Sequence, residues 1–515
     1  MPTEFGPAAG GTAGGPGVRV SGDPRLHTPS LRPYQERLIA DTKAAMGAGH
    51  RRICQVLSTG AGKTIVAATH IKEVVGQGDR VLFLSHRREI TGQTSRKLHD
   101  RGVDHGIIQA GFPSRPGERV QVASVQTLHA RAIRGSALEL PPANFVFVDE
   151  CHHTPARSYR QILEAYPEAV IIGMTATPCR GDGRGLGADF ELLVEGPQAA
   201  ELIELKALVP PIYYAPTMPD LSGVRVARGD YVEKDLAERV DRPELVGDVV
   251  TNWLRLGERR PTVIFASSVS HSVHLRDRFR DASIVADHID GSTPAEERDQ
   301  TLVGLADGTV EVVTNYGVLT EGWDCPEASC LVLARPTKHL GLNRQMVGRG
   351  LRPAPGKDDC IILDHAGGIY EHGLVTEDVT WTLEEDRRAV NPAHAARQRY
   401  DAPRLTICPE CGAVRSSGRA CPVCHWQPRP KPEPVEFVDG DLGRVDRQRV
   451  AAAAAYDQSA RQVFHAQLAY IALERGTNLA GRHTNTKKNS ASGRARARWC
   501  QSYPTKPSAR GFAPG

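Results

Sequence analysis

Short apolar runs that alternate with stretches of helical character occupy residues 50–370 of this chain. The runs are rich in β-branched residues and are continuous rather than alternating, which is typical of strands buried on both faces of a parallel sheet. The first set covers residues 53–57, 81–85, 120–125, 145–149 and 170–174, and the second covers 262–266, 284–289, 310–314, 330–334 and 360–364. Two sets of five are too many for one compact sheet. The pattern therefore predicts an α/β protein with two doubly wound parallel-sheet lobes, divided near Pro210 and Pro211.

The composition of the remaining segments predicts how the rest of the chain is organised. A Cys-rich stretch lies between polar and Pro-rich stretches, which we interpret as linkers. An amphipathic helix is expected at residues 451–475. The predicted parts are a flexible arm at 1–30, a first lobe at 31–209, a second lobe at 210–385, a linker at 386–403, a Cys-rich unit at 404–427, a second linker at 428–445, and a helical segment with a basic tail at 446–515.

The composition is typical of a soluble globular protein. Of the 515 residues, 40% are hydrophobic and 24% are charged. No apolar run approaches the ~18 residues that a membrane span needs. Residues 1–30 are rich in Gly, Pro and Thr and lack the apolar core of a signal peptide. We therefore expect a cytoplasmic protein.

The C-terminal tail is strongly basic, although the net charge of the whole chain is only +4. After Glu474 there is no acidic residue. Nine basic residues follow, namely Arg475, Arg482, Lys487, Lys488, Arg494, Arg496, Arg498, Lys506 and Arg510. Such a tail attracts polyanions, most often nucleic acid, and the alternative is a solvated tail without a partner.

A loop of small residues follows the first predicted strand. Residues 58–64 read Ser-Thr-Gly-Ala-Gly-Lys-Thr and lead into a helical stretch. Backbone N–H groups at such a helix start wrap an anionic phosphate chain, Lys63 would reach the β/γ-phosphates, and Thr64 would ligate Mg²⁺. The full pattern has Gly at the position of Leu57, so the string alone could be an ordinary turn. The residues expected to bind the nucleotide are Thr59, Gly60, Ala61, Gly62, Lys63 and Thr64.

Two carboxylates stand at the end of a later apolar strand. Residues 148–153 read Val-Asp-Glu-Cys-His-His and follow the run at 145–149. Asp149 would hold Mg²⁺, and Glu150 would orient and deprotonate a water molecule. Alone, an Asp-Glu pair is often a solvated turn. Together with the phosphate loop, it predicts nucleotide hydrolysis.

Three side chains in the second lobe could complete that chemistry. Gln345, Arg349 and Arg352 are spaced by four and three residues, so we expect them on one face of a helix. Two guanidinium groups on one face repel each other unless an anion lies between them. A γ-phosphate at the interface of the lobes would be such an anion, with an arginine finger supplied by the same chain. The alternative is a solvated, Arg-rich helix.

Four clustered cysteines predict a zinc site. Cys408, Cys411, Cys421 and Cys424 form two Cys-x2-Cys pairs separated by nine residues. Four thiolates in two close pairs suit tetrahedral Zn²⁺, and such a closed site is structural rather than catalytic. A pair of disulfides is the competing interpretation, but it does not fit a cytoplasmic protein. The role of the unit stays open between DNA contact, partner docking and folding support.

These motifs, in this order, resemble those of the superfamily-two helicases, the group that includes the DEAD- and DEAH-box proteins. The resemblance covers about residues 31–370, and residues 149–152 match the metal-and-base motif in its Asp-Glu-Cys-His form. It implies two RecA-like lobes that bind ATP and Mg²⁺ at their interface. The other matching segments are 31–35, 58–64, 83–89, 124–128, 174–178, 263–268, 314–326 and 345–353.

The resemblance also implies roles for single residues. Gln35, with Arg32 as a second candidate, would contact adenine, and Asp324 would contact the nucleotide ribose. Glu321 would link the nucleotide site to the nucleic-acid track, and Arg352 is favoured as the main arginine finger. His152, the last residue of the Asp-Glu-Cys-His motif, would couple that motif to the second lobe.

Residues 180–186, 320–324 and 348–353, with a Cys-rich unit after the second lobe, are similar to RadD-like bacterial and phage helicases. This resemblance implies an ATP-dependent helicase or translocase on nucleic acid. DNA in single-stranded or branched form is favoured, in repair or recombination, and RNA stays possible. The alternatives are a motor subunit of a restriction or defence complex with a partner nuclease, a phage replication or recombination helicase, and a binding module with a degenerate ATPase.

Overall fold

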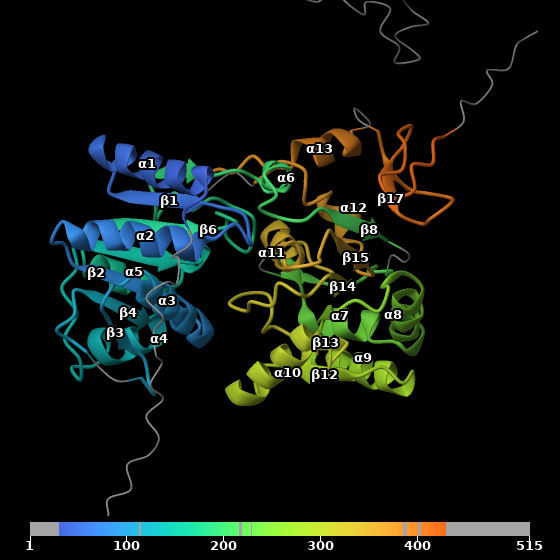
Figure 1. The fold of residues 1–515 in the computed structure, drawn as a ribbon, viewed down its shortest axis with the longest axis horizontal. Helices are drawn as coiled ribbons and strands as arrows, with labels where there is room; N and C mark the ends of the chain where they lie inside the picture. The colour runs from blue at the N-terminus through green and yellow to red at the C-terminus, as the bar shows by residue number, and fades with distance from the viewer. Residues whose placement is uncertain are drawn as a thin grey trace, which may run out of the picture. The chain divides into compact units, whose positions relative to one another are not determined.

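The computed structural model describes residues 30–112, 115–215, 219–227, 229–384, 389–399 and 403–428 (Figure 1). The N-terminal arm up to residue 29, the second linker from residue 429, the helix predicted at 451–475 and the basic tail lie outside the described residues. Within the described part, two large sheets contain only parallel strand pairs. The predicted α/β fold class with two lobes is therefore confirmed.

The first sheet has seven strands in the order β3-β4-β2-β5-β6-β1-β7. All five strands predicted for this lobe are present, and the short strands β3 and β7 at the two edges were missed. The bounds are β1 Arg52–Val56, β2 Val81–Ser85, β3 His105–Ile108, β4 Val120–Ser124, β5 Phe145–Asp149, β6 Val170–Thr175 and β7 Leu192–Glu195.

Both faces of this sheet are covered by helices. On one face, Phe83 of β2 packs in a core with Ile71 of helix α2 (Lys63–Gly76) and Leu98 of helix α3 (Arg88–Asp100). On the other face, Leu82 and Leu84 of the same strand pack with side chains of helix α5 (Arg157–Glu164). Each fully buried Leu or Phe contributes about 1.5–3 kcal/mol. Burial on both faces is the physical reason for the continuous apolar runs in the sequence.

The second sheet has six strands in the order β12-β13-β11-β14-β15-β8. The five predicted strands are present, although β12 and β13 each begin two residues later than expected. Strand β8 was missed because it is short and lies at the sheet edge, directly after the predicted division. The bounds are β8 Pro211–Tyr214, β11 Thr262–Ala266, β12 Ala286–Ile289, β13 Val312–Asn315, β14 Cys330–Ala334 and β15 Cys360–Asp364.

The other elements connect and flank the two sheets. None of the described helices has the length and apolar character that a membrane crossing needs. These elements are α1 Pro33–Gly47, α4 Val125–Leu128, η1 His129–Ile133, η2 Cys151–His153, α6 Ala199–Glu204, β9 Val226–Ala227, β10 Asp230–Tyr231, α7 Glu233–Val240, α8 Pro243–Leu256, α9 Val269–Asp281, α10 Ala295–Asp307, α11 Leu340–Gly350 and α12 Gly368–His372.

After the second sheet, the chain returns to the first lobe along residues 379–384, which we call the return segment. The backbone N–H of Gly187 donates to the carbonyl of Leu383 at 2.7 Å. The side chain of Gln198 donates to the carbonyl of Val379 and accepts from its N–H. Val379 and Trp381 are buried in the core beneath the first sheet. Part of the segment assigned to the second lobe, up to residue 385, therefore packs against the first.

The segment predicted as a linker, 386–403, contains a helix, α13 (Pro392–Gln398), which was not expected. Asn391 begins this helix, and its side chain accepts a hydrogen bond from the backbone of His394. Arg397 in the helix forms a bidentate ion pair with Glu377. These contacts fasten α13 to the chain that precedes it.

The Cys-rich unit is a small hairpin. Strands β16 (Leu405–Ile407) and β17 (Val414–Ser416) pair antiparallel, and the cysteines lie in the turns beside them. Cys408 and Cys421 are 1% exposed and pack with Tyr214, the last residue of strand β8. The hairpin therefore rests on the edge of the second sheet.

Candidate active site

The phosphate loop joins strand β1 to helix α2. Gly60 has φ 87° and Gly62 has φ 93°, the left-handed region in which a Cβ is strained. Gly62 is the N-cap of α2, so Lys63 and Thr64 stand in the first helical turn. Free N–H groups at this end can wrap a phosphate chain, as the sequence predicts.

Two side chains from helix α1 hold the phosphate loop. The Tyr34 hydroxyl and the Gln35 amide both donate to the carbonyl of Ala61, at 3.0 and 2.9 Å. The Gln35 carbonyl oxygen accepts from the backbone N–H of Arg32. A Cβ on Gly62 would lie 2.5 Å from Gln35 Nε2, so the loop fits Gln35 only with glycine there. The structure thus places Gln35, predicted to contact adenine, against the phosphate loop.

The two carboxylates Asp149 and Glu150 lie beside the phosphate loop. Asp149 ends strand β5 and is 7% exposed, and Glu150 is 5% exposed with φ 47°. Lys63 Nζ lies 3.7 Å from Glu150 Oε1. The tight left-handed turn at Glu150 aims its carboxylate back toward the phosphate loop.

The two carboxyl groups have opposite pKa shifts. Burial, reinforced by the neighbouring Glu150, raises the pKa of Asp149. Burial also opposes ionisation of Glu150, but Lys63 and His152 outweigh it and lower the pKa of that carboxyl. A lowered pKa favours the ionised form of Glu150, the form in which a carboxylate can accept a proton. A cation beside Asp149 would restore its charge, and the oxygens of Asp149 and Thr64 are the ligands that Mg²⁺ prefers.

A hydroxyl group on the next strand contacts both His152 and Glu150. Thr175 Oγ1, at the end of β6, lies 3.0 Å from His152 Nδ1 and donates to Glu150 Oε2 at 3.4 Å. The same oxygen accepts from the backbone N–H of Thr177 at 3.1 Å. The parallel strands β5 and β6 end side by side, which brings these groups together.

The three residues predicted on one helix face are divided in the structure. Helix α11 ends at Gly350, so Arg352 lies beyond it, and the prediction of one shared face was wrong. Gln345 donates to Thr177 Oγ1 of the first lobe at 3.3 Å. The guanidinium groups of Arg349 and Arg352 meet instead at the carbonyl of Trp323, at 3.1 and 2.8 Å.

Beyond burial, the charge of Arg352 contributes to the lowered pKa of Arg349, in line with the expected repulsion between the two guanidinium groups. Burial and then the charge of Arg352 lower the pKa of Arg349 to about 10. Burial likewise lowers the pKa of Arg352, whose Nη1 lies 2.8 Å from Asp324 Oδ1. A buried cation pair of this kind favours an anion beside it.

The second lobe touches the phosphate loop directly. A Cβ on Gly60 would lie 3.1 Å from Cγ of Arg352, and one on Gly348 would lie 2.6 Å from Cβ of Thr59. The close approach of the lobes therefore requires glycine at residue 348, whereas a Cβ on Gly60 would press most closely on Leu208 of the first lobe, at 2.9 Å. The contact brings the arginines of the second lobe to the loop at Thr59 and Gly60.

Sequence reasoning missed a histidine cluster around Glu321. His86 Nε2 lies 2.8 Å and His153 Nε2 3.4 Å from Glu321 Oε2, and His152 Nε2 lies 3.3 Å from Oε1. Glu321 follows strand β13 of the second lobe, whereas all three histidines belong to the first. The tandem pair His152-His153 was a visible signal, but its partner is distant in sequence.

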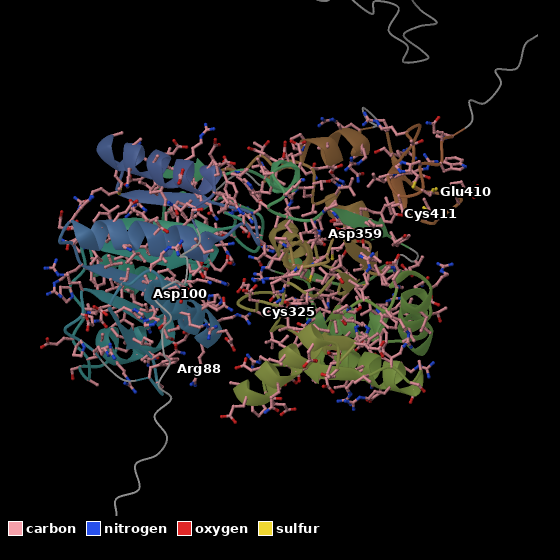
Figure 2. The ribbon with its side chains drawn as sticks, in the orientation of Figure 1. Arg88, Asp100, Cys325, Asp359, Glu410 and Cys411 are labelled. Atoms are coloured by element: carbon pink, nitrogen blue, oxygen red, sulfur yellow. The ribbon has the colours of Figure 1, made fainter. Side chains whose placement is uncertain are left out.

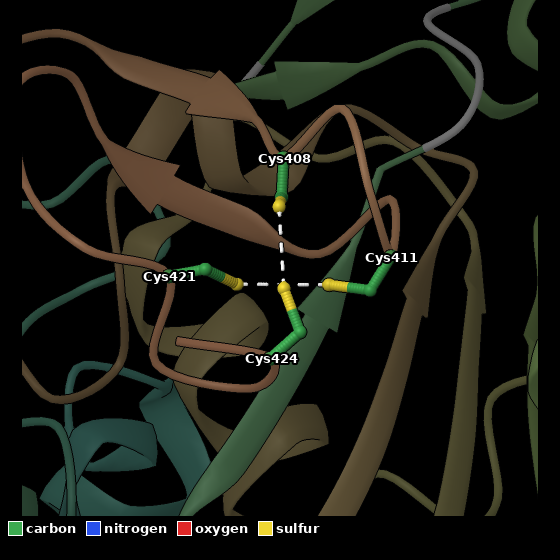
Figure 3. Close-up of side chains that lie close together, drawn as sticks. All are labelled: Cys408, Cys411, Cys421 and Cys424. Carbon is green, nitrogen blue, oxygen red and sulfur yellow. Dashed lines mark hydrogen bonds between the residues drawn. The ribbon is translucent and has the colours of Figure 1, made fainter. Parts of the chain in front are cut away.

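The four cysteines converge as predicted (Figure 3). The sulfurs of Cys408 and Cys424 are 3.6 Å apart, as are those of Cys411 and Cys421. Zn–S bonds of about 2.3 Å in a tetrahedron place sulfurs about 3.8 Å apart, so this arrangement fits Zn²⁺. The sulfur–sulfur distances are far from the about 2.05 Å of a disulfide. Figure 2 shows Glu410 and Cys411 in the hairpin that carries this cluster.

Comparisons with known proteins match both lobes of this chain. A family model described as type III restriction enzyme, res subunit, matches residues 28–180, and the helicase conserved C-terminal domain matches residues 244–354. A 51.5 kDa protein of a Lactococcus phage is 29% identical over 394 residues, which are 76% of this chain and 82% of the phage protein.

A second relative is the Saccharomyces cerevisiae protein named "Putative ATP-dependent helicase IRC3". It is 30% identical over 413 residues, and the match covers 73% of this chain but only 59% of the yeast protein. Among solved structures, the DNA-bound type ISP restriction-modification enzyme LlaBIII has a TM-score of 0.50 at 17% identity. That match covers 65% of this chain and 28% of LlaBIII, and it shows likeness of fold alone.

Proposed function

Because this chain belongs to the superfamily-two helicases, we propose that it is an ATP-driven motor that moves along nucleic acid. The observation that carries the proposal is the contact between Arg352 and Gly348 of the second lobe and the phosphate loop of the first. Hydrolysis at such an interface changes how the two lobes fit together. A lobe movement of this kind is what a motor needs in order to step.

Each site residue has a role in this proposal. Lys63 and the loop N–H groups hold the phosphates, Thr64 and Asp149 ligate Mg²⁺, and Glu150 activates water. Gln345 and the two arginines sense the γ-phosphate from the second lobe. The Mg²⁺ ion, when bound, neutralises charge on the phosphates. These phosphate-sensing residues are Gln345, Arg349 and Arg352. Asp324 would hold Arg352 in place and contact the ribose.

The path from hydrolysis to the nucleic-acid track runs, in our proposal, through His152. This imidazole contacts Glu150 at 3.4 Å on one side and Glu321 at 3.3 Å on the other. The carbonyl of Gly322, next in the chain, accepts a hydrogen bond from Gln93 of helix α3. A change at the base can therefore reach helix α3, which begins within residues 83–89. The resemblance to superfamily-two helicases implies that this segment contacts the nucleic-acid backbone.

DNA, in single-stranded or branched form, is the proposed track, with a role in repair or recombination like that of the RadD-like helicases. The second candidate is a motor subunit of a restriction complex, favoured by the family model that matches residues 28–180. A phage helicase is a third reading, supported by the Lactococcus phage relative. The cytoplasmic location stays a prediction.

We also propose that the four-cysteine cluster holds a structural Zn²⁺. The support is the spacing of the sulfurs and the burial of Cys408 and Cys421 against Tyr214. A closed site of this kind stabilises its hairpin and, through Tyr214, the way the hairpin rests on strand β8.

Steady-state ATP hydrolysis by wild type and Glu150→Gln tests the motor. It is measured without polymer and with single-stranded, duplex or forked DNA, or RNA. We expect one DNA form to stimulate turnover, and Glu150→Gln to lower it by about 10²–10⁴-fold because the base is lost. Lys63→Ala should lose turnover but keep nucleic-acid binding.

Turnover that persists in Lys63→Ala would contradict the assigned site. A wild type that no polymer stimulates would favour the restriction-complex reading, because the partner would then be required. If RNA alone stimulates turnover, the track is RNA rather than DNA.

A further inference from the structure

Glu321 gathers imidazole groups from two separate segments of the first lobe. His86 follows strand β2, and His153 ends the 3-10 helix η2 behind the Asp-Glu-Cys-His motif. Three possible ligand atoms, one each from His86, His153 and Glu321, all lie within 4.8 Å of one another. The side chains of Glu321 and His86 are 9% and 14% exposed, whereas that of His153 is 38% exposed, so the cluster is open to solvent on the side of His153. The proposed motor function gives His153 no role.

The donor set is that of a transition-metal site. Two imidazole nitrogens and one carboxylate oxygen are a known three-ligand set for Zn²⁺, with a water as the fourth ligand. Ligand bonds of about 2.0–2.1 Å in a tetrahedron separate neighbouring donor atoms by about 3.3 Å. His153 Nε2 is 3.4 Å from Glu321 Oε2, and His86 Nε2 is 2.8 Å from it. An ion would need His86 to withdraw by about half an ångström.

We propose that His86, His153 and Glu321 form a second metal site, for Zn²⁺ or a similar transition-metal dication, that bridges the two lobes. Imidazole ligands favour such ions over Mg²⁺, which prefers oxygen. The site is therefore distinct from the Mg²⁺ site expected at Thr64 and Asp149.

The charges around the cluster are compatible with an ion. The two oxygens of the Glu321 carboxyl group face three imidazole rings, those of His86 and His153 at Oε2 and that of His152 at Oε1. Arg87 opposes the ion, since its Nε donates to His86 Nε2 at 3.3 Å and lies 3.6 Å from Glu321 Oε2. The guanidinium group would have to withdraw before His86 could bind a metal. We therefore expect weaker binding than at the four cysteines.

The position of the site gives it a consequence for the proposed motor. His86 and His153 belong to the first lobe and Glu321 to the second, so one ion would hold the lobes together. Reopening after hydrolysis would slow, and Zn²⁺ would inhibit turnover. This consequence rests on the proposed function, whereas binding of the ion does not.

The test is calorimetric titration of Zn²⁺ into the full-length protein whose four-cysteine site is already filled. Wild type should bind one further equivalent of Zn²⁺. His153→Gln should weaken that binding at least tenfold, because the Gln amide can still donate to Glu321 but is a poor metal ligand. The matched control is His99→Gln, which changes an exposed histidine on helix α3 and should bind as wild type does.

Two further measurements make the result decisive. His86→Gln should lose the same equivalent, and thermal unfolding of each variant shows whether it folds. Co²⁺ in the second site should give weak d–d absorption without thiolate charge transfer. If wild type takes no second equivalent, or if His153→Gln binds it equally well, the cluster is only a hydrogen-bonded contact and the proposal is overturned. If the ion binds but turnover is unchanged, the site stands and the lobe-bridging consequence fails.

Discussion

Arg352 reaches past the end of helix α11 and places its Nη1 2.8 Å from Oδ1 of Asp324. The same nitrogen donates to the carbonyl of Trp323 at 2.8 Å, and Cγ of Arg352 lies beside Gly60. Two acceptors in one loop thus fix the arginine next to the phosphate loop. Its position is set before any phosphate binds, which reduces the ordering cost of catalysis.

Replacement of this arginine should remove catalysis without removing binding. An arginine finger is worth about 10³–10⁵ in kcat, so Arg352→Ala should lower DNA-stimulated turnover by about 10³-fold or more. Arg352→Lys should recover little of it, because an ammonium cannot serve both acceptors and a phosphate. Steady-state ATPase assays, with DNA affinity measured in parallel, check this.

The control for that experiment is Arg255→Ala, which removes an arginine whose guanidinium donates to Asn252 on the exposed side of helix α8. Its turnover should equal that of wild type. An Arg352→Ala protein with wild-type turnover would move the role of finger to Arg349.

Removal of the metal from the Cys-rich hairpin should have a local effect. Cys421→Ser replaces a buried thiolate, so we expect one equivalent of zinc to be lost and residues 404–428 to become sensitive to protease. The two sheets have their own cores and should remain folded. Zinc content and limited proteolysis, followed by mass spectrometry, give the measurement.

His425→Asn is the matched change for this site. His425 is exposed and has φ 58°, a conformation that Asn tolerates, and the four thiolates of the proposed site would already complete the coordination. Zinc content should be unchanged. Loss of zinc in His425→Asn would mean that the imidazole, rather than one of the cysteines, is a ligand.

The parts of the fold that could be predicted are those whose cause is local. Strands β2, β5, β11, β14 and β15 match their predicted bounds because burial on both faces leaves a continuous apolar run. The edge strands β3, β7 and β8 were missed because an edge is shorter and partly exposed, which weakens that signal. The phosphate loop was predictable because its backbone requires glycine.

The parts of the site that could not be predicted depend on long-range contacts. Arg352 was placed on a helix that ends two residues earlier, although Gly348, Gly350 and Pro353 were a visible sign of that end. The histidines around Glu321 are about 170 residues or more away in sequence, and no local pattern reports their meeting. The return segment was missed for the same reason.

The return segment leads to a prediction about two glycines in one loop. A Cβ on Gly185 would lie 2.3 Å from the backbone of Leu383, whereas a Cβ on Gly181 would meet nothing within 4 Å. Gly185→Ala should therefore displace the segment and lower the free energy of unfolding by about 1–3 kcal/mol. Gly181→Ala should change it by no more than about 0.5 kcal/mol. Denaturant unfolding measures the free energy of unfolding of both variants. Equal values would mean that the return segment accommodates the added Cβ at residue 185 without loss of stability.

Thr175 gives a test that separates a catalytic contact from a merely structural one. Thr175→Val keeps the shape but removes the hydroxyl between His152 and Glu150. Thr42→Val removes an equally buried hydroxyl that joins Leu38 and Gln55, far from the carboxylates in sequence. Both should lower the free energy of unfolding by about 1–3 kcal/mol, because buried partners are left unsatisfied.

Only Thr175→Val should also lower turnover, because the base and the imidazole that links it to Glu321 lose their common partner. We expect kcat to fall by about tenfold or more, with little change in KM for ATP, since the phosphate loop is untouched. Steady-state kinetics at a temperature where both variants are folded gives the comparison. If the two variants lose turnover equally, the effect is one of stability, and Thr175 has no part in positioning the base.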